Sequence, residues 1–246
     1  MKFHSRELRK DVQVNVLIPN GMAGKSYKTL WLLHGLGDDH TAWMRRSSIE
    51  RYASELGIAV VMPCADRSWY TNTAGGANYF DLIAKELPTL LRSTFCGMSE
   101  KREDNLIAGL SMGGYGALKF ALSLPESYGA CISLSGALDI TRRGRPYDLT
   151  EWKSIFGDGL CDALELEGSK HDIFALAEKN KAEGLPFPTI YMWCGTDDSL
   201  IEANRAFDKL LSSLDVPHLF DVSEGDHSWK WWDLHIYNAL KYLFNK

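Results

Sequence analysis

The spacing of apolar residues predicts a sheet built mainly of buried strands. Residues 12–18 alternate apolar and polar side chains for most of their length, as expected of a half-buried strand, and we expect this one to be antiparallel. Later runs are short and mostly apolar, which is typical of strands covered on both faces. These later runs are 29–33, 58–62, 106–110, 130–134, 189–194 and 218–222.

Helical spacing fills most of the intervals between these strands. The predicted helices are 47–56, 79–95 with Pro88 as a disrupting residue, 117–122, 200–214 and 231–244. Between 138 and 188 the periodicity weakens to two short helices, near 152–156 and 173–183, and we interpret 142–183 as a partial lid. Strands that alternate with helices predict an α/β fold with a mainly parallel sheet and helices on both faces. We expect residues 1–246 to form one such domain.

The residues around Ser111 match the G-x-S-x-G pattern of a nucleophile elbow. In this motif a strand turns sharply into a helix, and Gly109 and Gly113 provide positions without a Cβ where neighbouring chain comes close. The alternative interpretation is an ordinary glycine-rich turn. An apolar strand before Ser111 and a helix-compatible segment after it favour the elbow.

A nucleophilic serine needs a base, and the base needs a carboxylate to orient it. His227 follows the last predicted strand in a Gly-Asp-His loop, and its alternative role is that of a surface histidine. Asp197 and Asp198 both follow the 189–194 strand, and we favour Asp198. The alternative for the pair is that one of them caps the next helix, a role for which Asp197 is well placed. Asp226 is less plausible, since neighbouring side chains in an extended loop point apart.

Two backbone amides can stabilise the oxyanion of a tetrahedral intermediate. In a nucleophile-elbow enzyme they come from the residue after the serine, here Met112, and from the loop after an early strand, here 34–37. We choose Leu36 for the second amide. The alternative for His34 and Gly35 is a tight turn with a packed histidine.

Composition excludes several other classes of protein. The chain has 246 residues and a net charge of −5, which provides no electrostatic basis for nucleic-acid binding. We expect no membrane span, no secretory signal and hence a cytoplasmic location. The five cysteines lack the spacing of a zinc site, and the predicted chemistry needs neither a metal nor an organic cofactor.

Taken together, motifs across most of the chain resemble the esterase D-like branch of the α/β-hydrolases, and within it bacterial tributyrin esterases. The matching segments are 32–35 with Trp43, 60–63, 69–71, 108–116, 135–137, 193–195 with Asp198, and Gly225 with His227, Trp229 and Trp232. This resemblance implies that Asp198 is the acid of the triad. It also suggests that Trp69 and Tyr70 line the alcohol side, although packing under a loop is an equal alternative. For Trp229, Trp231 and Trp232 we favour packing around the His227 loop over the alternative of a binding platform.

These observations predict a serine carboxylesterase that acts on small or short-chain acyl esters through an acyl-enzyme. The triad would be Ser111, His227 and Asp198, with Leu36 and Met112 supplying the oxyanion amides. Within the same family, the alternatives are a thioesterase similar to S-formylglutathione hydrolases and an esterase for feruloyl or acetyl-sugar esters. A non-catalytic binding module is disfavoured because all three side chains are present. The expected partner is a small-molecule ester, and a homo-oligomer is compatible with the sequence.

Overall fold

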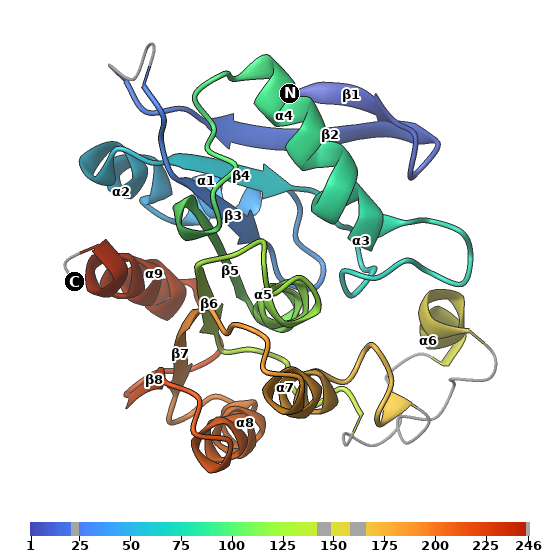
Figure 1. The fold of residues 1–246 in the computed structure, drawn as a ribbon, viewed down its shortest axis with the longest axis vertical. Coiled ribbons are helices and arrows are strands. Elements are labelled where there is room, and N and C mark those ends of the chain that lie inside the picture. The colour runs from blue at the N-terminus through green and yellow to red at the C-terminus, as the bar shows by residue number, and fades with distance from the viewer. Residues whose placement is uncertain (21–24, 142–148, 158–165, 245–246) are drawn as a thin grey trace.

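The computed structural model describes residues 1–20, 25–141, 149–157 and 166–244. These residues form an eight-stranded sheet with the order β1-β2-β4-β3-β5-β6-β7-β8 (Figure 1). The first two strands pair antiparallel with each other, β2 pairs antiparallel with β4, and the pairs from β4 to β8 are parallel. The strands are β1 (Lys2–Ser5), β2 (Lys10–Leu17), β3 (Thr29–Leu33), β4 (Ala59–Pro63), β5 (Asn105–Leu110), β6 (Ala130–Leu134), β7 (Thr189–Gly195) and β8 (His218–Ser223).

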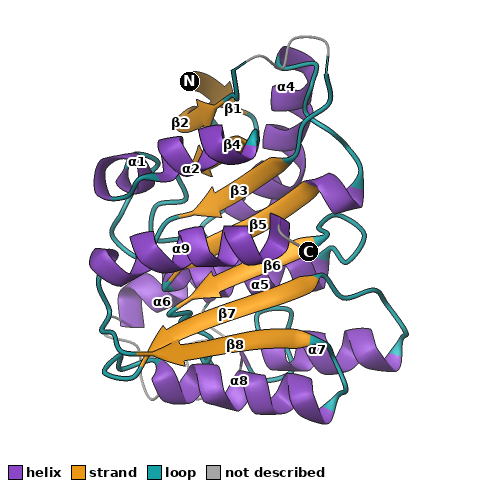
Figure 2. Cartoon of the chain, turned by 90° about the vertical axis from the view of Figure 1, so that its left-hand side faces the viewer, coloured by secondary structure: helices purple, strands orange, loops and turns teal. Residues whose placement is uncertain are grey.

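Helices cover both faces of the sheet (Figure 2). One face carries α1 (Ala42–Arg46), α2 (Ile49–Leu56) and α9 (Trp229–Phe244); the other carries α3 (Tyr79–Asp81), the π-helical turn η1 (Leu82–Glu86), α4 (Leu87–Thr94), α5 (Met112–Ser123), α7 (Ile173–Ala182) and α8 (Ile201–Ser213). A 3-10 turn, η2 (Arg102–Asp104), precedes β5. Strand β3 shows the cause of the layering, because Trp31 and Leu33 join one apolar cluster and Leu30 and Leu32 join the other. The predicted mainly parallel α/β fold is confirmed.

Three details differ from the prediction. Strand β1 and helix α1 are additional, and both are too short, at 4 and 5 residues, to show a clear period in the sequence. The helix predicted over 79–95 is divided, and its π-helical turn ends directly before α4, near whose start Pro88 lies. A proline lacks the N–H that would continue the helical hydrogen bonds, so an irregular turn just before it is physically reasonable.

The segment 142–183 falls partly outside the described residues. Its described helices are α6 (Leu149–Phe156) and α7. Ile173, Phe174 and Ala177 of α7 are buried in the apolar cluster beside α5, so this part of the segment belongs to the main helical layer. The lid therefore stays a prediction for the rest of the segment. Among the described residues, no helix is both long and apolar enough to cross a membrane.

Candidate active site

Ser111 lies in a strained turn between strand β5 and helix α5. Its backbone has φ 54° and ψ −117°, a conformation that a residue with a side chain rarely adopts. The chain around it is packed backbone against backbone: a Cβ at Gly109 would lie 2.2 Å from the Gly113 carbonyl oxygen, and one at Gly113 would lie 2.6 Å from the carbonyl oxygens of Leu33 and His34. Glycine is therefore required at both positions, and the turn is held rigidly against the end of β3.

The structure brings Ser111, His227 and Asp198 into one hydrogen-bonded row. His227 Nε2 is 3.0 Å from Ser111 Oγ, and His227 Nδ1 is 2.8 Å from Asp198 Oδ2. The three side chains come from the ends of β5, β8 and β7, which meet at the carboxyl edge of the sheet. The Asp198 side chain has no exposed surface, whereas 35% of the His227 side chain is exposed. This row connects a buried carboxylate to a solvent-facing hydroxyl through one imidazole.

Asp198 is fixed by backbone as well as by His227. Its Oδ1 accepts a 2.8 Å hydrogen bond from the Leu200 amide, just before α8. Burial raises the pKa of this carboxyl, but hydrogen bonds from His227, Ser135 and Leu200 outweigh burial and lower it below the usual value. Asp198 is therefore an ionised, oriented acceptor.

The other two aspartates make different contacts. Asp197 is exposed, and its amide donates to the Gly225 carbonyl at 2.9 Å. The expectation that Asp197 caps α8 is wrong, because Asp198 itself bonds the amide at the helix start. Asp226 is also exposed and accepts a 2.5 Å hydrogen bond from Ser228 rather than from the neighbouring histidine.

The loop after β3 passes directly beside Ser111. A Cβ at Gly35 would lie 3.6 Å from Ser111 Cβ and 2.7 Å from a methyl group of Leu110. Within the described ranges, the amides of Leu36 and Met112 have no hydrogen-bond acceptor in the protein. Two unused N–H donors thus belong to the two segments that flank the serine. The Met112 side chain is fully buried, and that of Leu36 is partly exposed at the mouth of the site.

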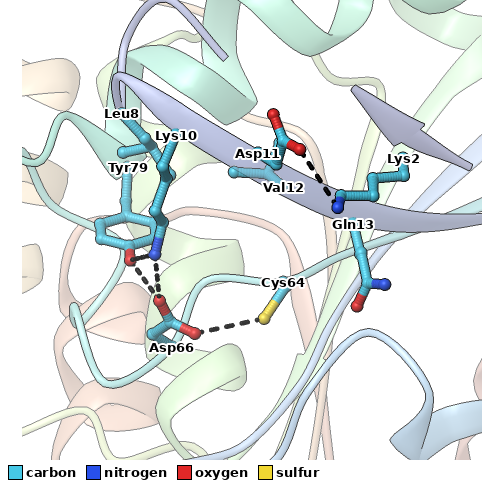
Figure 3. Close-up of a pocket in the computed structure, with 9 residues that line it drawn as sticks. All are labelled: Lys2, Leu8, Lys10, Asp11, Val12, Gln13, Cys64, Asp66 and Tyr79. Carbon is cyan, nitrogen blue, oxygen red and sulfur yellow. Dashed lines mark hydrogen bonds and ion pairs between the residues drawn. The ribbon is translucent and has the colours of Figure 1, made fainter. Parts of the chain in front are cut away.

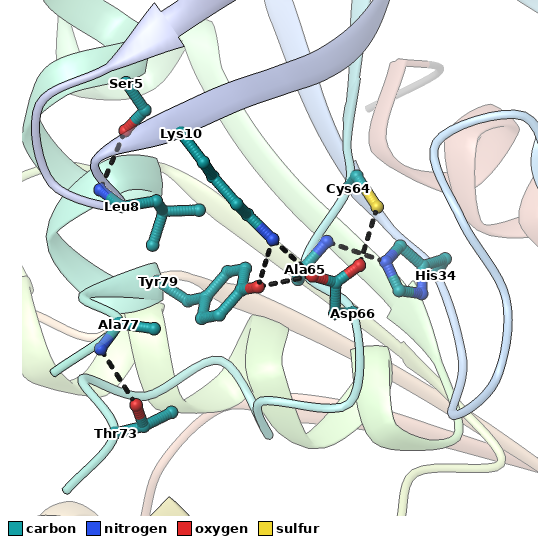
Figure 4. A network of polar contacts seen from close by, with 10 residues as sticks. All are labelled: Ser5, Leu8, Lys10, His34, Cys64, Ala65, Asp66, Thr73, Ala77 and Tyr79. Atoms are coloured by element: carbon teal, nitrogen blue, oxygen red, sulfur yellow. Dashed lines mark hydrogen bonds and ion pairs between the residues drawn. The ribbon is translucent and has the colours of Figure 1, made fainter. Parts of the chain in front are cut away.

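His34 holds this loop in position through hydrogen bonds of its ring and its carbonyl group. The Ala65 amide donates to its Nε2 at 2.9 Å (Figure 4). Nδ1 therefore carries the proton and donates to the Gly35 carbonyl at 2.8 Å. The Tyr70 hydroxyl donates to the His34 carbonyl at 2.8 Å. His34 is only 1% exposed, and burial lowers its pKa, which keeps the ring neutral. The sequence alternative of a packed histidine in a tight turn describes this residue correctly, and its packing serves the loop.

The segment that carries Ala65 is in turn tied to the N-terminal hairpin. Asp66 accepts hydrogen bonds from Lys10 at 3.0 Å, from Cys64 at 3.3 Å and from the Tyr79 hydroxyl (Figures 3 and 4). Burial tends to raise the pKa of Asp66, but these donors lower it, and burial beside Asp66 raises the pKa of Tyr79 to about 12. A small cavity of about 300 Å³ opens beside this cluster. Side-chain contacts thus link strand β2 to the loop beside Ser111.

Trp69 and Tyr70, the predicted alcohol-side residues, are not among the described residues that line the cavity over Ser111 and His227. Tyr70 has no exposed surface, and its ring packs so closely on Gly116 that a Cβ there would meet it at 2.5 Å. Trp69 is half-buried, with its ring 5.8 Å from the rings of both Tyr115 and Trp152. For Tyr70 the packing alternative fits this structure, and a substrate contact by Trp69 stays a prediction.

A cavity of about 550 Å³ opens over Ser111 and His227. Leu36 forms part of its wall, together with Trp229 and Trp232, for which the sequence favoured packing over a binding platform. Both tryptophans pack as well, since the Trp232 ring lies 4.8 Å from the His227 ring, edge to face. Sequence reasoning missed three charged residues of the wall, which are Asp38, Arg46 and Lys230. The only available signal was their position close to the predicted elements of the site.

Comparison with known proteins identifies the family. The family model described as "Putative esterase" matches residues 5–243. An acetyl esterase of Caldicellulosiruptor saccharolyticus is 32% identical over 261 residues, covering 99% of this chain and 96% of the relative. Two solved structures from Staphylococcus aureus are similar. The substrate-bound fluorophosphonate-binding serine hydrolase F has a TM-score of 0.92 and 35% identity, and the match covers 100% of this chain and 97% of the other. An S-formylglutathione hydrolase has a TM-score of 0.88 and 34% identity, and the match covers 99% of this chain and 97% of the other. The chain therefore belongs to this esterase family and is a serine carboxylesterase with the α/β-hydrolase fold.

Proposed function

We propose that Ser111, His227 and Asp198 are the catalytic triad of this esterase and that its preferred substrates carry a short acyl group. The observation that carries the assignment is the row of hydrogen bonds at 3.0 and 2.8 Å from the serine hydroxyl to the buried carboxylate. Such a row is what a serine needs to become a nucleophile at neutral pH. The acetyl esterase relative, 32% identical to this chain, supports the short acyl group.

The first half-reaction forms an acyl-enzyme. His227 Nε2 takes the proton of Ser111 Oγ as that oxygen attacks the ester carbonyl, and Asp198 stabilises the resulting imidazolium. The carbonyl oxygen gains negative charge, which the amides of Leu36 and Met112 stabilise. When the intermediate collapses, the bond from the carbonyl carbon to the alcohol oxygen breaks, and His227 gives its proton to the departing alcohol.

The second half-reaction regenerates the serine. Water reaches the acyl group from the solvent-facing side, where 35% of the His227 side chain is exposed. His227 removes a proton from this water, the water oxygen attacks the acyl carbon, and the same two amides again stabilise the oxyanion. Collapse then returns the proton to Ser111 and releases the carboxylic acid.

The test is the replacement of the nucleophile. Ser111→Ala should lower kcat for p-nitrophenyl acetate by about 10⁶-fold, as expected when a triad loses its serine. Ser93→Ala, at an exposed serine on α4, is the matched control and should retain wild-type rates. A fluorophosphonate probe should label the wild-type protein at Ser111, located by peptide mass spectrometry. Near-normal hydrolysis by Ser111→Ala would refute the proposed nucleophile.

Thioester hydrolysis is a second candidate, favoured by the 34% identity to an S-formylglutathione hydrolase. The same triad would act on it, since an acyl thioester also yields an acyl-serine. Measuring kcat/KM for S-formylglutathione and for p-nitrophenyl acetate and butyrate with one enzyme preparation separates the candidates. A value for the thioester well above those for both esters would make the thioesterase the better description.

A further inference from the structure

Two cations line the cavity that contains Ser111 and His227. Arg46 is the last residue of α1, and Lys230 lies in the first turn of α9. In the described part of the chain, no carboxylate lies within ion-pair distance of either cation, although the Arg46 charge counteracts the rise that burial causes in the pKa of Asp38. Asp38 is the carboxylate among the described wall residues, and it leaves the wall with an excess of one positive charge. This local excess stands against a net charge of −5 for the whole chain.

Both cations are held on aromatic rings. The Arg46 guanidinium carbon lies 5.8 Å from the centre of the Trp229 ring, and Lys230 Nζ lies 4.3 Å from that of Trp231. Trp229 is itself fixed, with ring centres 5.0 Å from Trp43 and 5.5 Å from Trp232 in edge-to-face contacts. The Arg46 charge is therefore presented on a packed surface rather than on a freely moving side chain, which lowers the entropy lost on binding a ligand.

The position of Lys230 is unfavourable for its own helix. The amino end of a helix carries partial positive charge, and the first turn of the 16-residue α9 contains no acidic residue to balance it. A lysine at that place adds a like charge. The cavity wall thus combines two side-chain cations with a helix amino terminus, and all three attract an anion.

Both cations adjoin the segment that follows His227. The proposed mechanism has His227 protonate the departing alcohol oxygen, so the alcohol part must lie next to its ring. Trp229, Lys230 and Trp232 follow His227 closely in the chain and line the same cavity, and the centre of the Trp232 ring lies 4.8 Å from that of the His227 ring. Arg46 joins this group through its contact with Trp229.

We infer that Arg46 and Lys230 are specificity-determining residues that select esters whose alcohol part carries a carboxylate or another anionic group. This inference rests on the proposed function, because it uses the side on which His227 protonates the leaving oxygen. The guanidinium can bind a carboxylate through two parallel hydrogen bonds, and the ammonium adds a second donor group.

The experiment compares two acetate esters that differ in charge, 4-acetoxybenzoate and its neutral analogue 4-acetoxybenzamide. The measured quantity is the ratio of their kcat/KM values, so that intrinsic reactivity cancels between enzyme variants. In the double variant Arg46→Gln, Lys230→Gln this ratio should fall about 5- to 10-fold from wild type, as expected for two partly exposed charge contacts. Arg45→Gln is the matched control on the same helix; Arg45 pairs with Asp39, and its loss should leave the ratio unchanged.

Ionic strength provides a second measurement. Raising the salt concentration from about 0.02 M to about 0.5 M should lower the wild-type ratio more than that of the double variant, because salt screens exposed charges. An unchanged ratio in the double variant, or an equal loss with both esters, would overturn the inference. If Ser111→Ala is inactive, such a result would still support the proposed triad and would contradict only the proposed selectivity for anionic esters. Persisting activity in Ser111→Ala would instead remove the proposed function on which the inference depends.

Discussion

The loops that carry His34 and His227 place two histidines beside Ser111 for different purposes. Both follow the carboxyl end of a strand and both adjoin the catalytic cavity. Among the residues that the structure describes, the ring nitrogens of His34 bond only to backbone groups, those of Ala65 and Gly35, and the residue is 1% exposed. The ring of His227 bonds instead to a serine hydroxyl and a carboxylate, and 35% of its side chain is exposed.

The difference shows that the partners of each ring nitrogen decide what a histidine can do. Burial lowers the pKa of His34, and a proton arriving at its Nε2 would break the bond from the Ala65 amide. His34 is therefore a neutral structural residue that holds the Gly35–Leu36 segment in place. His227 has a nitrogen free to exchange a proton with the substrate once the Ser111 hydroxyl has reacted, and solvent can reach it. We expect changes around the two rings to have effects of different kinds.

Among the residues that hold the two histidines in place, the largest effect should come from the carboxylate that orients His227. Asp198→Asn should lower kcat by about 10⁴-fold, because an amide group can hold the imidazole in the wrong tautomer and cannot stabilise the imidazolium. Steady-state kinetics with p-nitrophenyl acetate measure this. Asp197→Asn changes the exposed neighbour and should be nearly neutral. If the two variants had the opposite order of activity, Asp197 would be the acid and the orienting role of Asp198 would be wrong.

A smaller but still large effect should follow from replacing His34. His34→Gln should lower kcat by about 10²- to 10³-fold, the typical loss of one oxyanion donor, because the Leu36 amide is no longer held in place. KM should change much less, since the cavity wall keeps its other residues. His40→Gln, in the same loop, is the control and should remain close to wild type, with thermal melts verifying that both variants fold. An equal loss of activity in both variants would argue for general loop damage.

Much of this architecture was predictable because buried parallel strands leave continuous apolar runs. The runs at 29–33, 106–110 and 189–194 correspond to β3, β5 and β7, and the residues at their carboxyl ends include Ser111 and Asp198. The motif around Ser111 was readable because only glycine tolerates the close backbone contacts at 109 and 113.

The support for the site was not predictable in the same way. The bond from Tyr70 to the His34 carbonyl joins residues 36 apart, and the contacts of Asp66 join it to Lys10, which is 56 residues away. Such pairs depend on how loops meet in three dimensions, and no local period records them. Arg46 was missed for a related reason. Helix α1 has only 5 residues, and Arg46 reaches the cavity wall through its contact with the Trp229 ring, which lies far away in the sequence.

A third measurement extends the comparison to stability. His171, like His34, is buried, and burial and the nearby Lys119 lower its pKa to about 3. Between about pH 3 and pH 6.5 the folded protein therefore keeps this ring neutral, whereas the unfolded chain, with a histidine pKa of about 6.5, binds a proton. Because the unfolded state binds more protons, stability is lost as the pH falls below about 6.5, by up to about 1.4 kcal/mol per pH unit. Urea unfolding between about pH 6 and pH 4 should show a shallower loss in His171→Gln than in wild type. The exposed control His4→Gln should keep the wild-type slope, and an unchanged slope in His171→Gln would contradict the buried neutral ring.

The smallest effect should come from Tyr70→Phe, which separates the two interpretations of this residue. As a support, Tyr70 contributes one hydrogen bond to the His34 carbonyl at 2.8 Å, worth about 1 kcal/mol, so kcat should fall about 5-fold with little change in KM.

As an alcohol-side residue it would instead contact the substrate, and its loss would raise KM by an amount that depends on the alcohol group. Measuring kcat and KM for phenyl, ethyl and p-nitrophenyl acetates distinguishes the two. Because Tyr70 has no exposed surface and its ring packs on Gly116, we expect the same modest fall in kcat for every alcohol; a change in KM confined to the aryl esters would place the ring in the substrate site.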